Sequence, residues 1–586
     1  MKERRLIPVR DRALCRKDRR RGPAPIPKRS GARRTGFLIG LIAATGIVPL
    51  IMASCSSSTT TGPNPVTVEN YHINTGYRVP PNPVLNTSTP SQYDYAVFTR
   101  YYEKPEPKQI RAVLVLIPGF YGGAGGFDKM AKTIVQMSGG QIEVWAVDRR
   151  SVMIDDLTGL QEAMRERNPS IAFDYYFSGA TIDGKTYAGP PTSSSLSYMS
   201  EWGLDMTMKD LNTIISLIPQ PYRKTNVFLG GHSLGSWLVQ DYAAYDFDGN
   251  PSTLSDAGYN QIAGIIQLDG GGTGLFPSLT EAQYLSGTTG NSITLSGLSF
   301  SFPGIDQLRQ TPADVIPAGV IAGLGPEIIK VFTFIQIEGI YAELDPNALS
   351  PLLQNSDFQL IATLLLGNIQ LKATNEAMLG FTMDRHFDPI GLMTGTLGIA
   401  NGPLAPFPSA ISPGETMSQP TDHGSMVYTW NSDGHITNIK DVEAALSNTY
   451  TTITEWYFPM RLAIDAMAFG DSYAVGTTDW QWDEGLHVTH TSQMDAPVLV
   501  FGGESGLEQT DTVFYKYRDL LPPARGCAGQ PRSACGFDIH MMPNYTHMDI
   551  LLSDPAVAPD GVDATIYRWI IAHTVSATSM PAPVLP

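Results

Sequence analysis

The segment Gly231-His232-Ser233-Leu234-Gly235 constrains the fold of this chain more than any other feature of its sequence. A glycine on each side of a serine is needed where a strand turns abruptly into a helix, because a side chain at either position would collide with the neighbouring element. The residues before it, 227–229, are strand-like, and those after it, 237–245, are helix-like. The sequence therefore predicts a sharp turn that presents the hydroxyl of Ser233. A structural turn with an unreactive serine is the alternative.

Short apolar runs alternate with amphipathic stretches on both sides of this turn. The runs are typical of buried strands, and the stretches at 127–137 and 204–218 are typical of helices. This alternation predicts an α/β fold with a mostly parallel sheet flanked by helices. The predicted core strands are 112–117, 142–147, 226–229, 262–268, 498–501 and 537–541.

A long segment separates the fourth predicted strand from the fifth. At about 220 residues it is far beyond an ordinary connection between a strand and a helix. It contains helix-like apolar patches at 328–340 and 360–371, and the aromatic cluster Trp456-Tyr457-Phe458. We interpret residues 273–492 as a mainly helical cap inserted before the penultimate core strand, which leaves 95–272 and 493–586 as the two parts of the core. An independent domain is the alternative.

The N-terminal residues have the pattern of an export signal. Residues 1–34 contain 14 Lys/Arg and 3 Asp/Glu, and an uncharged apolar stretch follows from Phe37 to Ala53. This pattern predicts a signal peptide over residues 1–54. The residues before Cys55 resemble a bacterial lipoprotein signal, although Met52 stands where Leu is usual. That resemblance implies an exported protein with a lipid such as palmitate on Cys55, anchored at the outer membrane or cell surface. An uncleaved membrane anchor is the alternative.

The charge of the remaining chain excludes several kinds of partner. Outside residues 1–34 there are 26 basic and 53 acidic residues, so this part should repel nucleic acid. No cluster of His, Cys, Asp and Glu has the spacing of metal ligands. We therefore expect no nucleic-acid partner, no metal and no cofactor. Residues 55–94 are interpreted as a tether and N-terminal extension, and the oligomeric state is not predicted.

The turn at Ser233 and its flanking elements resemble the α/β-hydrolase superfamily, which includes lipases and esterases. The resemblance covers most of residues 95–272 and 493–575. Its members carry a triad in the chain order nucleophile, acid, histidine. The resemblance implies that Ser233 is the nucleophile. It also implies that His547, in Asn544-Tyr545-Thr546-His547-Met548-Asp549 after the last strand, is the general base.

The sequence leaves the acid of the triad open between two residues. The usual position follows the strand at 498–501, but Gly506 stands there, and Glu504 is two residues away. Asp269, at the end of the preceding strand, is the other candidate and the one that we favour. For the oxyanion hole, the resemblance implies the backbone N–H groups of Phe120 and Leu234.

Two shorter segments of the sequence predict local structural features. Cys527 and Cys535 flank a short loop, and in an exported protein this predicts a disulfide, with two free thiols as the alternative. Asp148-Arg149-Arg150, directly after the second predicted core strand, is expected to form a structural ion pair that steadies neighbouring loops.

These features together predict a carboxylic ester hydrolase that works through an acyl-enzyme on Ser233. The apolar cap indicates a lipophilic small-molecule ester. A peptidase or amidase with the same triad is one alternative, because the turn does not separate esters from amides. A non-catalytic surface binding protein on a hydrolase fold is another, and the missing acid at position 506 favours it.

Overall fold

The computed structural model describes most of the chain from residue 64 onward. The residues described are 64–274, 278–287, 292–295, 298–311, 328–367, 370–388, 391–409, 414, 416–448, 451–469, 478–574 and 579–586. The predicted signal peptide and Cys55 lie outside these residues. Within the described part, no helix is both long enough and apolar enough to cross a bilayer.

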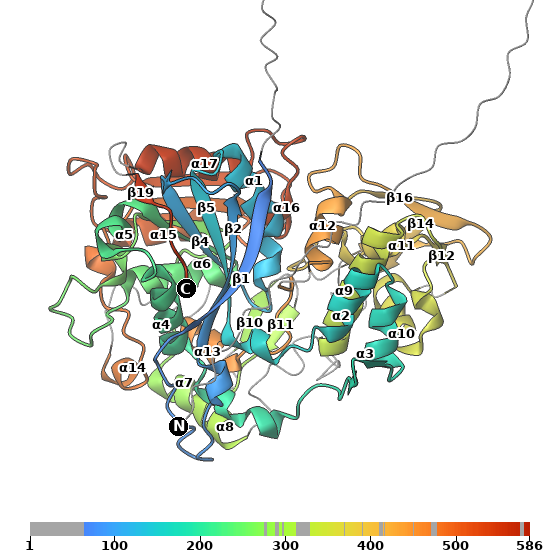
Figure 1. Cartoon of the computed structure of the whole chain (residues 1–586), viewed down its shortest axis with the longest axis horizontal. Helices are drawn as coiled ribbons and strands as arrows, with labels where there is room; N and C mark the ends of the chain where they lie inside the picture. Colours follow the sequence, from blue (N-terminus) through green and yellow to red (C-terminus); the bar gives the residue numbers. More distant parts are fainter. Residues whose placement is uncertain are drawn as a thin grey trace, which may run out of the picture. The chain divides into compact units, whose positions relative to one another are not determined.

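An eight-stranded, mostly parallel sheet forms the centre of the structure (Figure 1). Its strand order is β1-β2-β5-β4-β8-β9-β17-β18. The strands from β5 to β18 run parallel to their neighbours, while β2 is antiparallel to both β1 and β5. The bounds are Val66–Asn74 (β1), Tyr95–Glu103 (β2), Ala112–Ile117 (β4), Ile142–Asp148 (β5), Val227–His232 (β8), Gly264–Leu268 (β9), Val498–Gly503 (β17) and Phe537–Met542 (β18).

Helices cover the sheet on both sides. Helices α1 and α17 contact each other and pack on β5 and β17, whereas α4 and α6 contact each other and pack on β2, β8 and β9. The predicted fold class is thereby confirmed. The core helices are α1 (Asp128–Met137), α4 (Leu204–Ile215), α5 (Gln220–Asn226), α6 (Leu234–Ala244), α15 (Thr512–Leu520), α16 (Asp549–Leu552) and α17 (Val562–His573).

The long segment between β9 and β17 is a mainly helical insertion, and its described residues form three small sheets. Residues 61–586 form one compact unit, so the exact extent of the cap, 273–492, stays a prediction. The helices are α7 (Glu281–Ser286), α8 (Ile305–Gln310), α9 (Ile328–Leu344), α10 (Ser356–Leu366), α11 (Asn375–Met383), α12 (Ile439–Leu446), α13 (Met460–Met467) and α14 (Asp479–Asp483). The strands are β10 (Ser292–Leu295), β11 (Leu298–Ser301), β12 (Lys372–Ala373), β13 (Ile399–Asn401), β14 (Leu404–Pro408), β15 (Thr416–Pro420) and β16 (Val427–Asn431).

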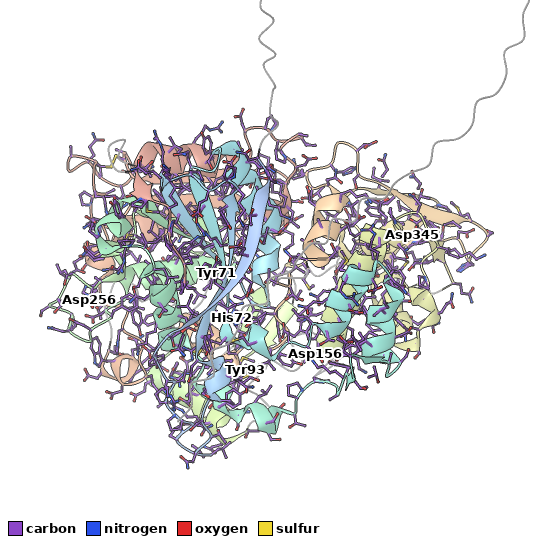
Figure 2. The ribbon with its side chains drawn as sticks, in the orientation of Figure 1. Tyr71, His72, Tyr93, Asp156, Asp256 and Asp345 are labelled. Atoms are coloured by element: carbon purple, nitrogen blue, oxygen red, sulfur yellow. A yellow bond between two sulfur atoms is a disulfide. The ribbon has the colours of Figure 1, made fainter. Side chains whose placement is uncertain are left out.

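Two helices from the first half of the core sequence pack on this insertion. Helices α2 (Thr158–Glu166) and α3 (Ser170–Phe177) lie beside α9 and α10 in Figure 1. The ring of Phe177 stacks on that of Phe334 in α9, with the centroids 4.2 Å apart. Asp156, labelled in Figure 2, precedes α2 and accepts a hydrogen bond of 2.9 Å from the hydroxyl of Tyr175 in α3. Helices α2 and α3, which we assigned to the core from the sequence, therefore pack against the insertion.

Three further features lie outside the main sheet or at its edge. The predicted extension, 55–94, contains the edge strand β1. The disulfide between Cys527 and Cys535 is present, which confirms that prediction. Two short strand pairs complete the structure: β3 (Gln109–Ile110) pairs with β19 (Met580–Pro581), and β6 (Thr181–Ile182) pairs with β7 (Lys185–Thr186).

The insertion attaches to the core along a glycine-rich loop that follows β4. The backbone of residues 452–455 runs antiparallel to residues 121–125, and hydrogen bonds of 2.8–2.9 Å join Gly123 to Ile453, Gly125 to Thr452 and Glu455 to Tyr121. A Cβ at Gly123 would lie 2.2 Å from the Thr452 carbonyl oxygen. At Gly123 and Gly125 the backbone of the insertion therefore approaches too closely to leave room for a side chain.

Replacing Gly123 with alanine should therefore loosen the attachment of the insertion. We expect Gly123→Ala to lower the free energy of unfolding by about 1–3 kcal/mol, because its new methyl group overlaps a backbone carbonyl. Gly126→Ala is the matched control, since its Cβ would meet only side-chain atoms at 3.6 Å or more. Urea unfolding of both variants measures the difference, and an equal stability of the two would contradict this account of the loop.

Candidate active site

Ser233 stands on a strained turn between β8 and α6. Its backbone has φ 57° and ψ −127°, which is rare for a residue other than glycine. A Cβ at Gly231 would lie 2.0 Å from the Gly235 carbonyl oxygen, and a Cβ at Gly235 would lie 2.2 Å from that of Ile117. Neither position has room for a side chain, as expected from the sequence. Ser233 is half-buried and lines a cavity.

Asp269 and His547 form a buried pair close to this turn. The Nδ1 atom of His547 lies 2.6 Å from Oδ2 of Asp269, and both residues are buried. The Asp269 carboxylate also accepts hydrogen bonds from the backbone N–H groups of Gly503 (2.9 Å) and Leu507 (2.8 Å). Burial alone would raise the pKa of Asp269, but His547 and these N–H groups outweigh it and hold the pKa below its usual value. Asp269 is therefore a carboxylate at neutral pH.

The structure does not bring Glu504, the other candidate acid, to His547. Its side chain is exposed, whereas Nδ1 of the imidazole is already occupied by Asp269. Gly506 explains the arrangement, because a Cβ at this position would lie 2.2 Å from Oδ2 of Asp269. The carboxylate of Asp269 thus fills the space that a side chain at 506 would need.

A second acidic side chain next to Asp269 was missed from the sequence. Glu508 is 4% exposed, and its backbone N–H donates to Asp269 Oδ1 at 3.2 Å. Burial, and then the negative charge of Asp269, raise the pKa of Glu508 to about 8. Glu508 is consequently mostly protonated at neutral pH and adds little negative charge beside Asp269. The sequence carries no signal for this role.

The loop that carries His547 is held by Asp549. Its carboxylate accepts hydrogen bonds of 2.7–2.9 Å from Thr546 in the same loop and from Thr396 and Thr437 of the insertion. The insertion therefore helps to fix the position of the imidazole. Met548-Asp549 was part of the motif read from the sequence, but its contacts with the insertion were not foreseeable.

His232 packs against the imidazole of His547. The two ring centroids are 4.2 Å apart, and Nε2 of His232 lies 3.1 Å from the His547 carbonyl oxygen. Burial, and then the charge of His547, lower the pKa of His232 to about 3. His232 is therefore neutral under ordinary conditions, and it braces the His547 loop without adding charge.

Each of the two predicted oxyanion residues lies near Ser233. Leu234 is the first residue of α6, directly after the serine. Phe120 belongs to the loop after β4 and lines the same cavity as Ser233 and His547. Gly119 brings this loop against the turn, because a Cβ there would lie 2.4 Å from the Ser233 Cβ.

The cavity beside Ser233 and His547 has mostly apolar walls. The core contributes the loop after β4, and the insertion contributes side chains from α9, α11 and the segments around 392 and 453. Such a lining suits an apolar ligand with a few polar groups at one end. The lining residues are Pro118, Gly119, Phe120, Tyr121, Gly122, Gly123, Gly126, Phe127, His232, Ser233, Phe332, Ile335, Met383, Leu392, Met393, Ile453, Thr454, His547, Met548 and Leu551.

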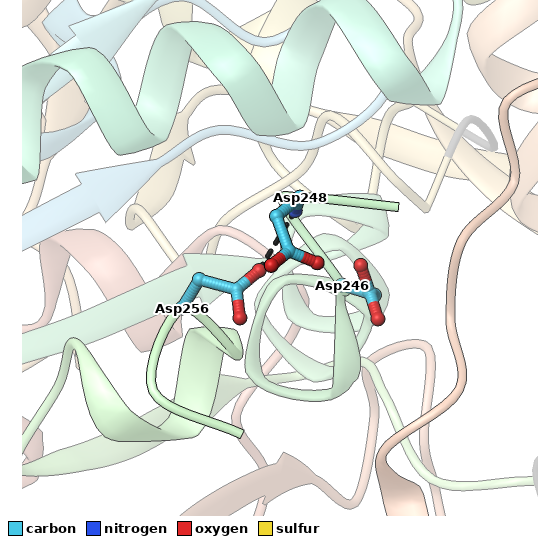
Figure 3. Close-up of side chains that lie close together, drawn as sticks. All are labelled: Asp246, Asp248 and Asp256. Carbon is cyan, nitrogen blue, oxygen red and sulfur yellow. Dashed lines mark hydrogen bonds between the residues drawn. The ribbon is translucent and has the colours of Figure 1, made fainter. Parts of the chain in front are cut away.

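One acidic cluster elsewhere departs from the expectation that no metal-binding group is present. In the described part of the chain, Asp246, Asp248 and Asp256 bring carboxylate oxygens within 4.8 Å of one another (Figure 3). The carboxylates accept hydrogen bonds from backbone N–H groups of their own loop, including those of Phe247 and Asn250. These bonds account for the close approach of the three carboxylates, and we assign no ion to them.

Comparison with solved structures finds hydrolases of several kinds. They include a proposed lipase from Sulfolobus solfataricus (12% identity, TM-score 0.41, 86% of this chain and 94% of that one). A monoacylglycerol lipase from Paleococcus ferrophilus matches at 12% identity and TM-score 0.29 (82% and 99%). A haloalkane dehalogenase variant from Bradyrhizobium elkanii matches at 10% identity and TM-score 0.33 (87% and 99%). No family model and no curated protein matches the sequence.

The sheet and the turn at its centre define the class of fold. The mostly parallel sheet has helices on both sides, and a serine stands between two space-restricted glycines at the end of a central strand. The protein therefore has an α/β-hydrolase fold with a large insertion before the penultimate strand.

Proposed function

We propose that the protein is a serine hydrolase that cleaves lipophilic carboxylic esters with Ser233, His547 and Asp269. The observation that carries the proposal is the buried 2.6 Å contact between His547 and Asp269 beside the cavity that Ser233 lines. A carboxylate on Nδ1 fixes the tautomer of the imidazole, so that Nε2 can accept a proton. The lowered pKa of Asp269 supports this role, because the acid must remain charged.

The reaction would proceed through an acyl-enzyme. Oγ of Ser233 attacks the ester carbonyl carbon and gives its proton to Nε2 of His547, while the carbonyl oxygen becomes an oxyanion held by the N–H groups of Phe120 and Leu234. The C–O bond to the alcohol then breaks as His547 returns the proton to the departing oxygen. Water, activated by the same imidazole, releases the acid and regenerates Ser233.

The walls of the cavity support a lipophilic acyl or alcohol group. Its side chains are chiefly aliphatic and aromatic, and several come from the insertion, such as Phe332, Ile335 and Met393. Burying each further CH₂ group of a substrate in such a site contributes up to about 0.8 kcal/mol.

The identity of the acid is tested by Asp269→Asn and Glu504→Gln side by side. We expect Asp269→Asn to lower kcat for p-nitrophenyl esters by about 10³- to 10⁴-fold, because the imidazole loses its orienting carboxylate. Glu504→Gln, a change at an exposed side chain, should retain the activity of the wild-type protein. Circular dichroism establishes that both variants are folded. An equal loss in the two variants, or an active Asp269→Asn, would refute the proposed triad.

The preference for lipophilic esters is tested with a series of acyl chain lengths. We expect kcat/KM to rise by about tenfold or more from acetyl to octanoyl esters, as the chain fills the apolar cavity. Ser233→Ala, measured with every ester, gives the background rate. A steady decrease of kcat/KM with chain length would lead us to abandon this preference while leaving the triad intact.

A further inference from the structure

Arg149 holds the loop that carries the predicted oxyanion donor. It follows β5 directly, and its side chain is 2% exposed. Its guanidinium donates hydrogen bonds to three backbone carbonyls of the loop after β4: those of Pro118 (2.8 Å), Gly119 (2.7 Å) and Gly122 (2.9 Å). We expected a structural ion pair at this position, but the guanidinium also binds the backbone beside Ser233.

The bond to the Gly119 carbonyl has a consequence for Phe120. The carbonyl of Gly119 and the N–H of Phe120 belong to one peptide unit, and that unit is trans. In a planar trans peptide the two groups point in opposite directions. A guanidinium that binds the carbonyl therefore directs the Phe120 N–H away from itself. Gly122 donates a hydrogen bond of 3.1 Å to the same carbonyl, which fixes the plane further.

The partner of Arg149 comes from the insertion. Nε of Arg149 donates to Oε2 of Glu455 at 2.7 Å, and the Glu455 side chain is also 2% exposed. Ser151 donates a hydrogen bond to the other carboxylate oxygen. The guanidinium also lies 5.1 Å from the ring centroid of Phe458, and that ring packs on Phe120 at 4.6 Å. The insertion thus contacts Arg149 through Glu455 and contacts Phe120 through Phe458.

We propose that Arg149, held by Glu455 of the insertion, is a positioning residue that aims the Phe120 N–H at the oxyanion. This inference rests on the proposed function, since it concerns the same site. It assigns the insertion a part in catalysis besides shaping the cavity. Without Glu455 the guanidinium loses its carboxylate partner, and without the guanidinium the Gly119 carbonyl loses one of the two donors that fix its peptide plane. Arg149 itself does not touch the substrate.

The test uses two matched pairs of variants. Arg149→Lys keeps the charge but loses the planar fork that reaches several acceptors. Its control is Arg100→Lys, because Arg100 forms an ion pair with Glu143 that is similarly buried, with 4% and 1% exposed side chains, on strands β2 and β5. Glu455→Gln and Glu143→Gln form the second, milder pair. The readout is the second-order rate of labelling of Ser233 by a fluorophosphonate, together with kcat and KM for an ester and the melting temperature.

A positioning role predicts a loss of rate that stability does not explain. We expect Arg149→Lys to label about 100-fold more slowly than Arg100→Lys, the size of effect that follows removal of one oxyanion donor. KM should change less than threefold, so the loss appears in kcat. Glu455→Gln should label at least fivefold more slowly than Glu143→Gln. If Arg149→Lys does not fold, the labelling rates of Glu455→Gln and Glu143→Gln decide whether the positioning role holds.

Equal labelling rates within each matched pair, after correction for the folded fraction, would overturn the positioning role while leaving the triad in place. A wild-type protein that is labelled but does not turn over esters would overturn the proposed substrate class alone, because the labelling comparison remains valid. A wild-type protein that fluorophosphonates do not label would overturn both proposals.

Discussion

The turn between β8 and α6 is the constraint on which the rest of the site depends. Ser233 has a positive φ, and neither Gly231 nor Gly235 has room for a Cβ. Such a backbone persists only where the surroundings hold it. Here the Ser233 N–H donates to the Leu268 carbonyl oxygen at 2.9 Å, so the end of β9 fixes the turn. Asp269 is the next residue, so the same contact places the end of β9 from which Asp269 reaches His547 beside the turn.

The site is shared between the core and the insertion. The core supplies Ser233, Asp269 and His547, whereas Thr396 and Thr437 of the insertion bind the Asp549 carboxylate that holds the His547 loop. The insertion also lies along the glycine-rich loop and provides much of the apolar wall. A change in the position of the insertion would therefore alter the support of the His547 loop and of the loop after β4, whereas core residues hold Asp269 and the turn at Ser233.

The sequence predicted those features that are set by local patterns. Apolar runs located six of the eight strands of the sheet, and β4 was predicted with its observed bounds. The strands β1 and β2 were not predicted. The edge strand β1 is only half-buried, and the buried strand β2 contains Thr99 and Arg100 at its centre, so neither has the continuous apolar pattern of the parallel strands. The packing of α2 and α3 on α9 depends on contacts such as Phe177 with Phe334, far apart in the chain, which no local pattern reveals.

The site was predictable to a similar degree. The glycine pattern predicted Ser233 as the nucleophile, the position after the last strand predicted His547 as the base, and the sequence left two carboxylates open for the acid. The three-dimensional structure favours Asp269 over Glu504 as the partner of His547. The Asp269 carboxylate fills the space beside Gly506, whereas Glu504 is exposed to solvent. Glu455 pairs with Arg149 across 306 positions of the chain, and nothing in its immediate sequence indicates a partner.

The most direct test of the account is a crystal structure of the protein after reaction with an alkyl phosphonate that mimics the tetrahedral intermediate. The account predicts phosphorus bonded to Oγ of Ser233, and a phosphonyl oxygen about 2.7–3.1 Å from the backbone nitrogens of both Phe120 and Leu234. The alkyl chain should lie against the apolar wall from the insertion. A phosphonate attached to another residue, or one whose oxygen faces away from Phe120 and Leu234, would contradict it.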